Sequence, residues 1–420
     1  MTYDEALAYW FGRINYEVRA ARPADLKLER MHALLRLLGD PHNRVRLVHV
    51  TGTKGKGSTC AMLAAVLRAA GYRVGLFTSP HLEHVEERIQ VDGRPISPAE
   101  LAARMAEVAA AERLLERAGP PAPGLTFFEI ATAVGFLHFC YRRCDLAVIE
   151  VGLGGRFDST NVCTPLLAVI TNVGLDHTAQ LGNTLEEIAY QKAGIIKRRI
   201  PVVCGVTQPG PREVVRRVAA EMDAPLWEPD HAAVAGLEVG LLGSHQRSNA
   251  AVVVAAVARL RAAGLSIPPA ALARGLQAVH WPARVECVGR DPVLVLDTAH
   301  NLPSTQALVA TLRDAFPDVT GRKHVVFAVS SDKQYPEMLA VLAGYFDHFY
   351  LTRYANPRGV PPEKLAAVLA DVAPAKPSSI HPTSRDAWLA ARAATRPADL
   401  LCVTGSVFLA GELRPLCRPD

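Results

Sequence analysis

The amino-acid sequence predicts an α/β protein with two doubly wound domains, each a mainly parallel sheet between layers of helices. Short segments that are almost continuously apolar alternate with helical patterns along most of the chain. Strands of that composition are typical of parallel sheets, which are buried on both faces. The alternation is interrupted once, near residues 281–292, and 420 residues are enough for two or three domains with separate cores.

The first domain is expected to span residues 1–287. Residues 1–44 are predicted to form a helical lead-in. Strands are then predicted at residues 45–50, 74–77, 146–151, 166–171 and 202–206. Helices are predicted between them at residues 58–70, 128–139, 185–193 and 212–222, and a longer helix at 249–263 ends at Gly264.

The second domain is expected to span residues 288–420 and to be smaller. The Trp-Pro-Ala-Arg sequence at 281–284 and the Asp-Pro pair at 291–292 predict the boundary. Strands are predicted at residues 293–296, 324–329, 349–351 and 401–404, with helices at 305–316, 336–343, 361–369 and 387–394. This second series predicts a Rossmann-like fold.

Composition and charge exclude several classes of protein. Hydrophobic residues make up 50% of the chain and charged residues 21%, which is ordinary for a globular protein. The net charge of +5 is spread along the sequence, which favours small anionic ligands and argues against a nucleic-acid interface. No apolar run is long enough to span a membrane, and the first residues lack the features of a signal peptide. We therefore expect a cytoplasmic protein without a membrane partner.

The eight cysteines are scattered, and Cys140 and Cys144 have no second pair at zinc-finger spacing. Free thiols in the core are therefore expected rather than a metal site or a disulfide framework.

Residues 52–58 (Gly-Thr-Lys-Gly-Lys-Gly-Ser) join the first predicted strand to the next helix. Backbone N–H groups of such a loop and the helix dipole converge on an anion, and Lys56 adds a positive charge. The strict Walker pattern has four residues between its glycines, whereas two separate Gly52 from Gly55. By itself, the loop is equally consistent with a glycine-rich turn at the start of a core helix.

Polar side chains follow three of the predicted strands. Ser79 follows the second strand, Glu150 ends the third, and Asp176-His177 follows the fourth. The carboxyl ends of parallel strands form the usual ligand site, and Mg²⁺ takes few protein ligands together with phosphate oxygens. Taken singly, Ser79 is more simply a turn cap and His177 a loop histidine, whereas Glu150 has the Walker-B arrangement.

Further motifs extend the pattern over nearly the whole chain. They lie at residues 28–31, 78–82, 87–89, 126–129, 150–161, 175–177, 192–195, 243–250, 281–284, 297–301, 332–333 and 405–406. Together with the phosphate loop, this ordered series resembles the folylpolyglutamate synthase/dihydrofolate synthase family of the Mur ligase superfamily. The resemblance implies a P-loop ATPase domain of the Mur ligase type and a C-terminal α/β domain that binds glutamate and completes the ATP site.

The resemblance also implies an ATP-dependent amide ligase. A substrate carboxylate would attack the γ-phosphate of ATP to give an acyl phosphate, and the amine of L-glutamate would then displace phosphate. The implied ATP-binding residues are Gly52, Thr53, Gly55, Lys56, Gly57, Ser58, Asn249, Arg284 and Asp297. The implied metal ligands, for Mg²⁺ at two sites, are Ser79, Glu150, His177 and Lys192. The implied catalytic residues are Lys56, His177, Lys192, His300 and Ser406, in a protein expected to be monomeric.

Lys192 matches the lysine that relatives carry as a carbamate, an anionic metal ligand formed with CO₂. A solvated helix lysine is the alternative. Residues matching the dihydropteroate pocket of bifunctional relatives are Asp25, Leu26, Lys27, Thr126, Phe127, Phe128, Phe157, Asp158 and Ser159. Phe127 or Phe128 would stack on a pterin, and Asp158 would accept from its N–H groups. The phenylalanines could instead belong to the core.

The chain departs from the family pattern at Lys54 (usually Asn), Gln191 (usually Glu), Ala283 (usually Gly) and Leu302 (usually Pro), as well as at Lys27, where glycine is common. None of these changes removes a reacting group. Two other functions remain open. A cell-wall ligase would need a domain for a nucleotide-linked sugar, and a noncatalytic ATP-dependent switch would bind ATP without glutamate-dependent ADP release.

Overall fold

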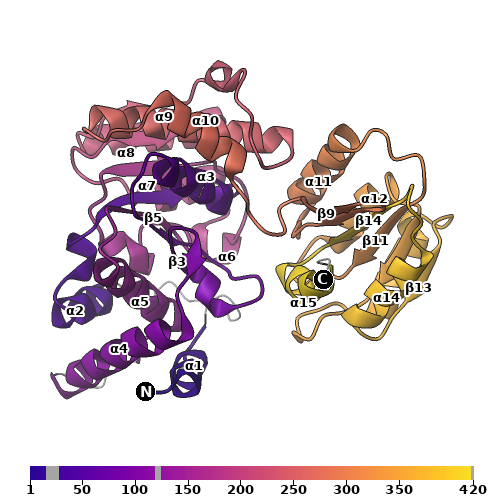
Figure 1. The fold of residues 1–420 in the computed structure, drawn as a ribbon, viewed down its shortest axis with the longest axis horizontal. Helices are drawn as coiled ribbons and strands as arrows, with labels where there is room; N and C mark the ends of the chain where they lie inside the picture. The colour runs from indigo at the N-terminus through magenta and orange to yellow at the C-terminus, as the bar shows by residue number, and fades with distance from the viewer. Residues whose placement is uncertain (16–27, 119–123, 418–420) are drawn as a thin grey trace. The chain divides into compact units, whose positions relative to one another are not determined.

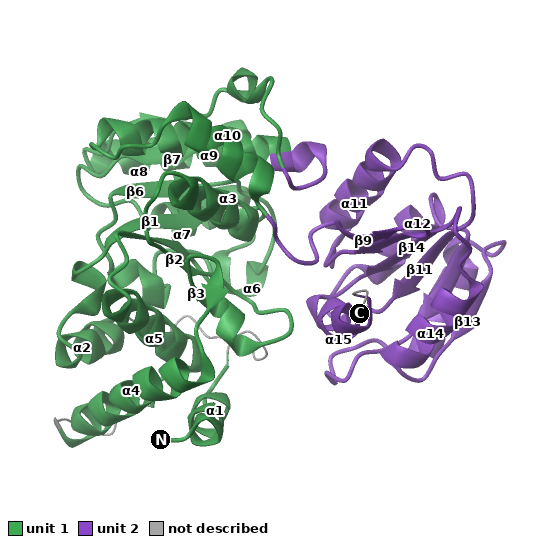
Figure 2. Cartoon of the chain, viewed as in Figure 1, with its two compact units in different colours: residues 1–239, 247–279 green, residues 240–246, 280–420 purple. Residues whose placement is uncertain are grey.

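The computed structural model describes residues 1–15, 28–118 and 124–417. The chain forms two compact units, shown in different colours in Figure 2. Unit 1 contains Met1–Val239 and Arg247–Val279, and unit 2 contains Gly240–Gln246 and His280–Asp420. The boundary predicted after residue 287 falls inside a strand of unit 2, β9 (Glu286–Arg290).

Unit 1 is built on an eight-stranded sheet with the order β4-β3-β2-β5-β1-β6-β7-β8. Its strands are β1 (Arg46–Thr51), β2 (Val74–Phe77), β3 (Ile89–Val91), β4 (Arg94–Pro95), β5 (Leu146–Glu150), β6 (Leu167–Ile170), β7 (Val202–Cys204) and β8 (Leu226–Trp227). The strands from β2 to β8 in this order are parallel, and β3 and β4 add an antiparallel edge that the sequence did not predict. In the register, Val50 lies beside Glu150 and Thr51 beside Ile170, so the central strands end at one edge.

Helices cover both faces of this sheet, as Figure 1 shows. They are α1 (Tyr3–Phe11), α2 (Glu29–Leu37), α3 (Lys56–Ala69), α4 (Pro98–Ala118), α5 (Phe127–Tyr141), α6 (Thr178–Leu181), α7 (Leu185–Ala193), α8 (Pro209–Glu221), α9 (Ser244–Ala262) and α10 (Pro269–Ala278). Apolar residues of α1, α2, α4 and α5 form one core cluster with Leu47, Phe77 and Ile149 of the sheet. Helix α3 packs over β1, β2 and β5 and against α10. The 21-residue helix α4 was not predicted.

Unit 2 is built on a six-stranded sheet with the order β13-β12-β11-β14-β10-β9. Strand β9 runs antiparallel to β10 (Val293–Leu296), and the others are parallel: β11 (Lys323–Phe327), β12 (His348–Leu351), β13 (Ser378–Ile380) and β14 (Leu400–Thr404). Its helices are α11 (Leu302–Ala315), α12 (Tyr335–Ala343), α13 (Pro362–Val372), α14 (Ser384–Ala394) and α15 (Val407–Cys417). The predicted α/β class and the two mainly parallel sheets are confirmed.

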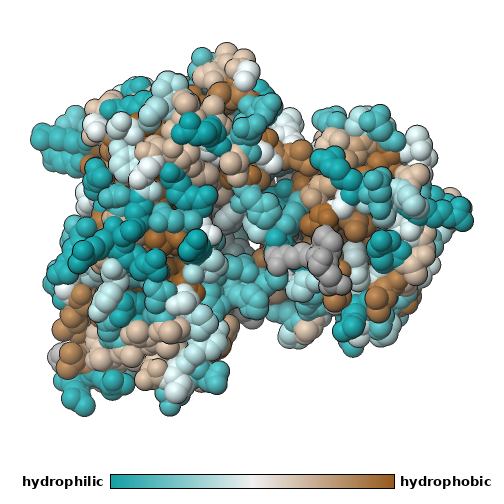
Figure 3. Space-filling model, viewed as in Figure 1, coloured by the Kyte–Doolittle hydropathy of each residue, from teal (hydrophilic) through white to brown (hydrophobic). Residues whose placement is uncertain are grey.

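Within the described ranges, none of the helices is both long and apolar enough to cross a bilayer. Figure 3 shows hydrophilic residues spread over the visible face of each unit, with smaller apolar patches among them. All eight cysteines are free, and all except Cys140 and Cys287 are buried, so the prediction of unpaired thiols is confirmed.

Candidate active site

The phosphate loop lies between the end of β1 and the start of α3, and its shape requires glycine at two positions. Gly55 precedes the first residue of α3 with φ of 76°. A Cβ atom added there would lie 2.3 Å from Oδ1 of Asn249, and one added at Gly52 would lie 1.8 Å from Oγ1 of Thr171. Both contacts are too short for a side chain, so α9 and the segment after β6 form the walls of the loop. Asn249, a predicted ATP-binding residue, therefore lies against it.

The segment that follows β6 braces the phosphate loop through hydrogen bonds. The backbone N–H of Lys54 donates to Oδ1 of Asn172 at 2.8 Å, and that of Thr53 donates to the Asn172 carbonyl at 3.0 Å. The carbonyl of Lys54 accepts from Oγ1 of Thr171 at 2.6 Å and from Nδ2 of Asn172 at 3.0 Å. Thr171 and Asn172 are not among the site residues predicted from the sequence. Their position directly after a strand was the signal that could have found them.

Two ammonium groups belong to this loop. Nζ of Lys56 donates to the Gly52 carbonyl at 3.1 Å, and Nζ of Lys54 pairs with Oδ2 of Asp176 at 2.8 Å. The unusual Lys54 therefore links the phosphate loop to the segment that carries His177. The His177 side chain is 55% exposed, and its Nε2 lies 3.9 Å from Oδ1 of Asp176.

Glu150 and Ser79, two predicted metal ligands, are brought together at the carboxyl edge of the sheet. Glu150 ends β5, is buried, and accepts from the Ser79 backbone N–H at 3.1 Å through Oε2. Across the described part of the chain, no three His, Cys, Asp or Glu side chains are grouped to hold a metal ion. A carboxylate and a hydroxyl suit Mg²⁺, because this ion completes its shell with water and phosphate oxygens. The donor set therefore fits Mg²⁺ bound with ATP.

Lys192 lies on α7 and is only 3% exposed, so a solvated helix lysine is excluded. Burial lowers the pKa of its amine well below the usual value, and the nearby Lys56 and Lys54 lower it further, while Asp176 partly opposes them. These electrostatic interactions place Lys192 near the phosphate loop. A Cβ added at Gly155 would lie 3.0 Å from the Lys192 carbonyl, so α7 also packs against the glycine-rich loop after β5.

This glycine-rich loop, residues 152–161, is held by the buried carboxylate of Asp158. Oδ2 accepts from the Leu153 N–H at 2.9 Å, and Oδ1 accepts from the Thr160 N–H at 3.0 Å and from the Thr160 hydroxyl. Burial raises the pKa of Asp158, and these hydrogen bonds counteract the rise. The loop therefore has a structural need for this carboxylate, a role that the residue pattern did not predict.

The residues predicted to bind the pterin differ in exposure: some are buried in the core and others lie at the surface. Phe127 is buried and stacks on Trp10 with ring centroids 4.9 Å apart, which matches the alternative that it belongs to the core. Phe128 is partly buried and packs over Gly152, while Phe157 is 46% exposed. Thr126 caps α5 by accepting from the Glu129 N–H.

The hydroxyl of Ser159 lies 2.7 Å from that of Thr132 on α5. The start of α5 and the glycine-rich loop are thus adjacent. Asp25, Leu26 and Lys27 lie outside the described residues.

Unit 2 gathers its predicted site residues at the ends of β10 and β14. The buried Asp297 accepts from the Ala299 N–H at 2.6 Å and from the Val285 N–H at 3.0 Å. Burial raises its pKa, while the charge of Arg284 lowers it.

His300 and Ser406 lie at the same carboxyl edge. Nδ1 of His300 lies 2.8 Å from the Thr298 carbonyl, and Oγ of Ser406 accepts from the Phe408 N–H at 3.1 Å. The Asp297 N–H donates to the Val403 carbonyl at 2.9 Å, which joins the two strand ends.

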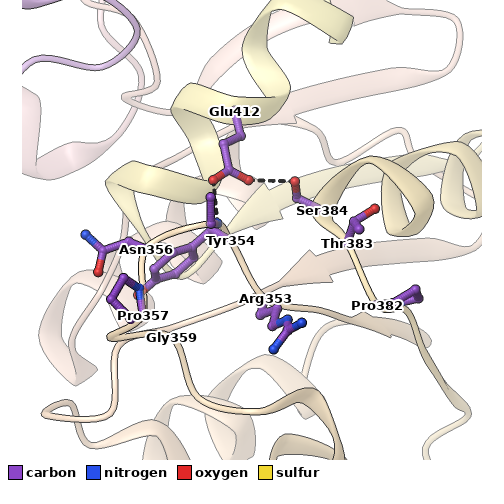
Figure 4. Close-up of a pocket in the computed structure, with 10 residues that line it drawn as sticks. Arg353, Tyr354, Asn356, Pro357, Gly359, Pro382, Thr383, Ser384 and Glu412 are labelled. Carbon is purple, nitrogen blue, oxygen red and sulfur yellow. Dashed lines mark hydrogen bonds between the residues drawn. The ribbon is translucent and has the colours of Figure 1, made fainter.

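Unit 2 also contains a cavity of about 530 Å³ near the ends of β12 and β13 (Figure 4). It is lined in part by Arg353, Tyr354, Ser384 and Glu412, and it contains none of the predicted site residues. Glu412 accepts from the Ala355 N–H at 2.7 Å and from the Ser384 hydroxyl at 2.6 Å. This carboxylate thus ties α15 to the loop after β12 and to the start of α14.

Comparison with known proteins identifies two family domains. Residues 50–204 match the Mur ligase middle domain, and residues 283–407 match the Mur ligase glutamate ligase domain. The dihydrofolate synthase/folylpolyglutamate synthase of Bacillus subtilis (strain 168) is 36% identical, with 98% of each chain covered. The folylpolyglutamate synthase of Lacticaseibacillus casei is also 36% identical, over 99% of this chain and 98% of that protein.

Solved structures agree with these matches. Mycobacterium tuberculosis folylpolyglutamate synthase complexed with ADP has a TM-score of 0.88 at 32% identity, covering 100% of this chain and 98% of that chain. E. coli FolC in complex with DHPP and ADP has a TM-score of 0.84 at 30% identity, covering 99% and 97% of the two chains. Because the matches run end to end in both sequence and structure, the chain belongs to the folylpolyglutamate synthase/dihydrofolate synthase family of Mur ligases.

Proposed function

We propose that this protein is an ATP-dependent ligase that joins L-glutamate to folates and also to dihydropteroate, producing ADP and phosphate. The observation that carries the proposal is the end-to-end match to relatives named for these activities. The phosphate loop, with Glu150 and Lys192 in the same unit, supports it chemically. We further propose that the enzyme is a cytoplasmic monomer whose partners are small molecules alone.

In the first step, an oxygen of the acceptor carboxylate bonds to the γ-phosphorus of ATP, and the bond to the β-phosphate oxygen breaks. This forms an acyl phosphate and ADP. The N–H groups of residues 52–58 and the ammonium of Lys56 stabilise the charge that develops on the transferring phosphoryl group. We assign Ser79, Glu150, His177 and Lys192 to Mg²⁺ at two sites, where the ion would neutralise phosphate charge.

We propose that Lys192 acts as a carbamate. Its neutral amine would add to CO₂ and release a proton, which converts a buried neutral group into an anion. Burial and the charges of Lys54 and Lys56 keep the amine neutral and therefore able to react, and the two cations would stabilise the carbamate anion.

In the second step, the amine of L-glutamate attacks the acyl carbon and phosphate leaves, with loss of a proton from nitrogen. We assign His300 and Ser406 to this reacting end, and Arg284, Asp297 and Asn249 to the nucleotide. The grouping of four of these side chains at the carboxyl edge of the unit 2 sheet supports the assignment. For the pterin we assign Phe128, Phe157, Asp158 and Ser159.

The test is an assay of ADP release with L-glutamate, comparing dihydropteroate and tetrahydrofolate as acceptors. Turnover with both is expected. Turnover with tetrahydrofolate alone would limit the enzyme to extending the glutamate tail. Glutamate-independent ATP binding without turnover would favour a switch, and turnover only with a nucleotide-linked sugar would favour a cell-wall ligase. Light scattering and cell fractionation test the oligomeric state and location.

A further inference from the structure

A buried chain of hydrogen bonds joins the centre of the unit 1 sheet to the glycine-rich loop. His49 lies on β1 directly before the phosphate loop, and both His49 and Thr160 are fully buried. Nε2 of His49 lies 2.8 Å from Oγ1 of Thr160, which also contacts Oδ1 of Asp158. Oδ2 of Asp158 then accepts from the Leu153 N–H at 2.9 Å. None of the reaction steps above uses His49 or Thr160.

The protonation of Asp158, Thr160 and His49 determines which group donates in each of these hydrogen bonds. A buried carboxylate accepts, so the Thr160 hydroxyl must donate its single proton to Asp158. The hydroxyl oxygen is then left to accept, and Nε2 of His49 must carry the proton that it donates. Nδ1 of His49 is buried and has no hydrogen-bond partner among the described residues, as expected for the unprotonated nitrogen of a neutral ring. Burial, together with the charge of Lys197, lowers the pKa of His49 to about 3.

This series of hydrogen bonds ends in the glycine-rich loop, which we assign to the acceptor substrate. Asp158 starts the short helix η4 (Ser159–Val162), and the loop carries Phe157 and Ser159 next to α5. The phosphate loop is braced separately, by Thr171 and Asn172. The His49 chain therefore supports the loop for the acceptor more directly than the loop for ATP.

We propose that His49 and Thr160 are positioning residues for the pterin-bearing substrate, acting through Asp158 on residues 152–161. This inference rests on the proposed function. Two buried residues, His49 on β1 and Thr160, would then help to determine how the acceptor binds.

Thr160→Val tests the proposal, because it keeps the shape of the side chain but leaves the His49 N–H without its acceptor and removes the hydroxyl donor of Asp158, which keeps the backbone donors of Leu153 and Thr160. We expect kcat/KM for the folate acceptor to fall about tenfold to a hundredfold, the size expected when buried polar groups lose their partners. KM for ATP should stay within about twofold, because Thr171 and Asn172 remain. Thr160→Ser keeps the hydroxyl and should restore kcat/KM.

The double variant His49→Leu/Thr160→Val should be no worse than Thr160→Val alone, because removing the imidazole removes the unpaired N–H. His138→Leu is the matched control. His138 is an equally buried histidine of unit 1 on α5, and its replacement should leave KM for the acceptor unchanged.

The proposal would be overturned by an equal rise in KM for ATP and for the acceptor. It would also be overturned if Thr160→Ser did not recover kcat/KM, or if the losses in the double variant were additive. If Thr160→Val proves too unstable to assay, Thr160→Ser and His49→Leu alone still decide the matter. The first should match the wild type, and the second should raise KM for the acceptor only. Failure of the proposed function is distinguishable, because the wild-type protein itself would then give no folate-dependent ADP release.

Discussion

At the scale of single residues, the site is a set of charges held out of water. Lys192 is buried beside Lys54 and Lys56, and Glu150 and Asp297 are buried carboxylates. Such groups destabilise a fold unless a partner or ligand compensates for them. Hydrogen bonds from backbone N–H groups compensate Glu150 and Asp297 in part, and we propose that ligand binding compensates these groups further.

Lys56→Ala should lower kcat roughly a hundredfold or more, because one preorganised cation is lost from the phosphate loop. The glutamate-dependent ADP-release assay measures this. Circular dichroism should show an unchanged fold, since Lys56 donates only to carbonyls of its own loop among the bonds described here. Near-normal turnover would show that this loop does not bind the ATP that reacts.

Lys192→Met should abolish turnover and yet raise the free energy of unfolding at neutral pH in buffer free of CO₂ and metal. Because the pKa of Lys192 is lowered in the folded protein, the unfolded chain binds a proton that the folded chain lacks. The free energy of unfolding of the wild type therefore decreases as pH falls from the pKa of Lys192 in the unfolded chain towards its pKa in the folded protein. Lys192→Met should remove this decrease. Urea titrations at several pH values measure the effect.

In Lys192→Ala, short carboxylates such as acetate should restore part of the activity by replacing the anion of the carbamate. Wild-type activity in Lys192→Ala without any addition would contradict the assignment.

Ala283 occupies a position that favours glycine, with φ of 52°. Relief of left-handed strain is worth about 1–2 kcal/mol, and the added freedom of the unfolded chain costs about 0.4–1 kcal/mol. Ala283→Gly should therefore stabilise the protein by about 0.5 kcal/mol, measured by chemical denaturation. Ala366→Gly, in the interior of α13, should instead destabilise it by about 0.5–1 kcal/mol. A loss of stability in both variants would mean that the strain at Ala283 is absent.

At the scale of elements, each functional loop is held by a neighbour that is distant in sequence. The phosphate loop contacts α9 and the segment after β6, and the glycine-rich loop contacts α5 and α7. Thr51, the last residue of β1, donates to the Gly154 carbonyl at 2.6 Å and so ties the glycine-rich loop to the end of this strand. The loops are thus positioned by packing rather than by their own turn preferences.

Gly55→Ala tests this packing. The new Cβ would lie 2.3 Å from Oδ1 of Asn249, so kcat/KM for ATP should fall about tenfold or more as the loop shifts. Gly264→Ala is the matched control, because Gly264 has a similarly positive φ of 91° but no atom of the described residues lies within 4 Å of the added Cβ. That variant should lose stability and retain its kinetics. Equal kinetic losses in both would mean that general instability causes the effect.

At the scale of the whole molecule, two units each have their own sheet, core and set of site residues. Several buried groups also make the fold sensitive to acid. Burial lowers the pKa of His49 to about 3 and of His138 to about 4. For Glu286, burial alone would raise the pKa, but hydrogen bonds from Arg414 and His280 bring it to about 2.

The free energy of unfolding should therefore decrease as pH falls from about 6.5, the pKa of a histidine in an unfolded chain. In this window the unfolded chain takes up protons that the folded protein does not, so stability rises with pH and is lost towards acid. His138→Gln should weaken the dependence between about pH 4 and 6.5. Urea midpoints across this range measure it, and an unchanged slope would contradict a neutral, buried His138.

Local patterns in the sequence predicted the fold class and the family correctly. Apolar strands and glycine-rich turns are local patterns, and they correctly identified the strands of both parallel series except β8 and β13. The edge strands β3, β4 and β9 were missed because short, partly polar strands are stabilised by their neighbours rather than by their own composition.

Packing between distant segments determines which candidate side chains are exposed, and no local pattern predicts it. Phe127 and Phe128 are adjacent in sequence, yet packing places one on Trp10 and leaves the other partly exposed. Asp158 matched a ligand-binding pattern, and the structure adds a second role for it through Leu153 and Thr160. Burial and hydrogen bonding depend on contacts between distant segments, which residue spacing along the chain does not encode.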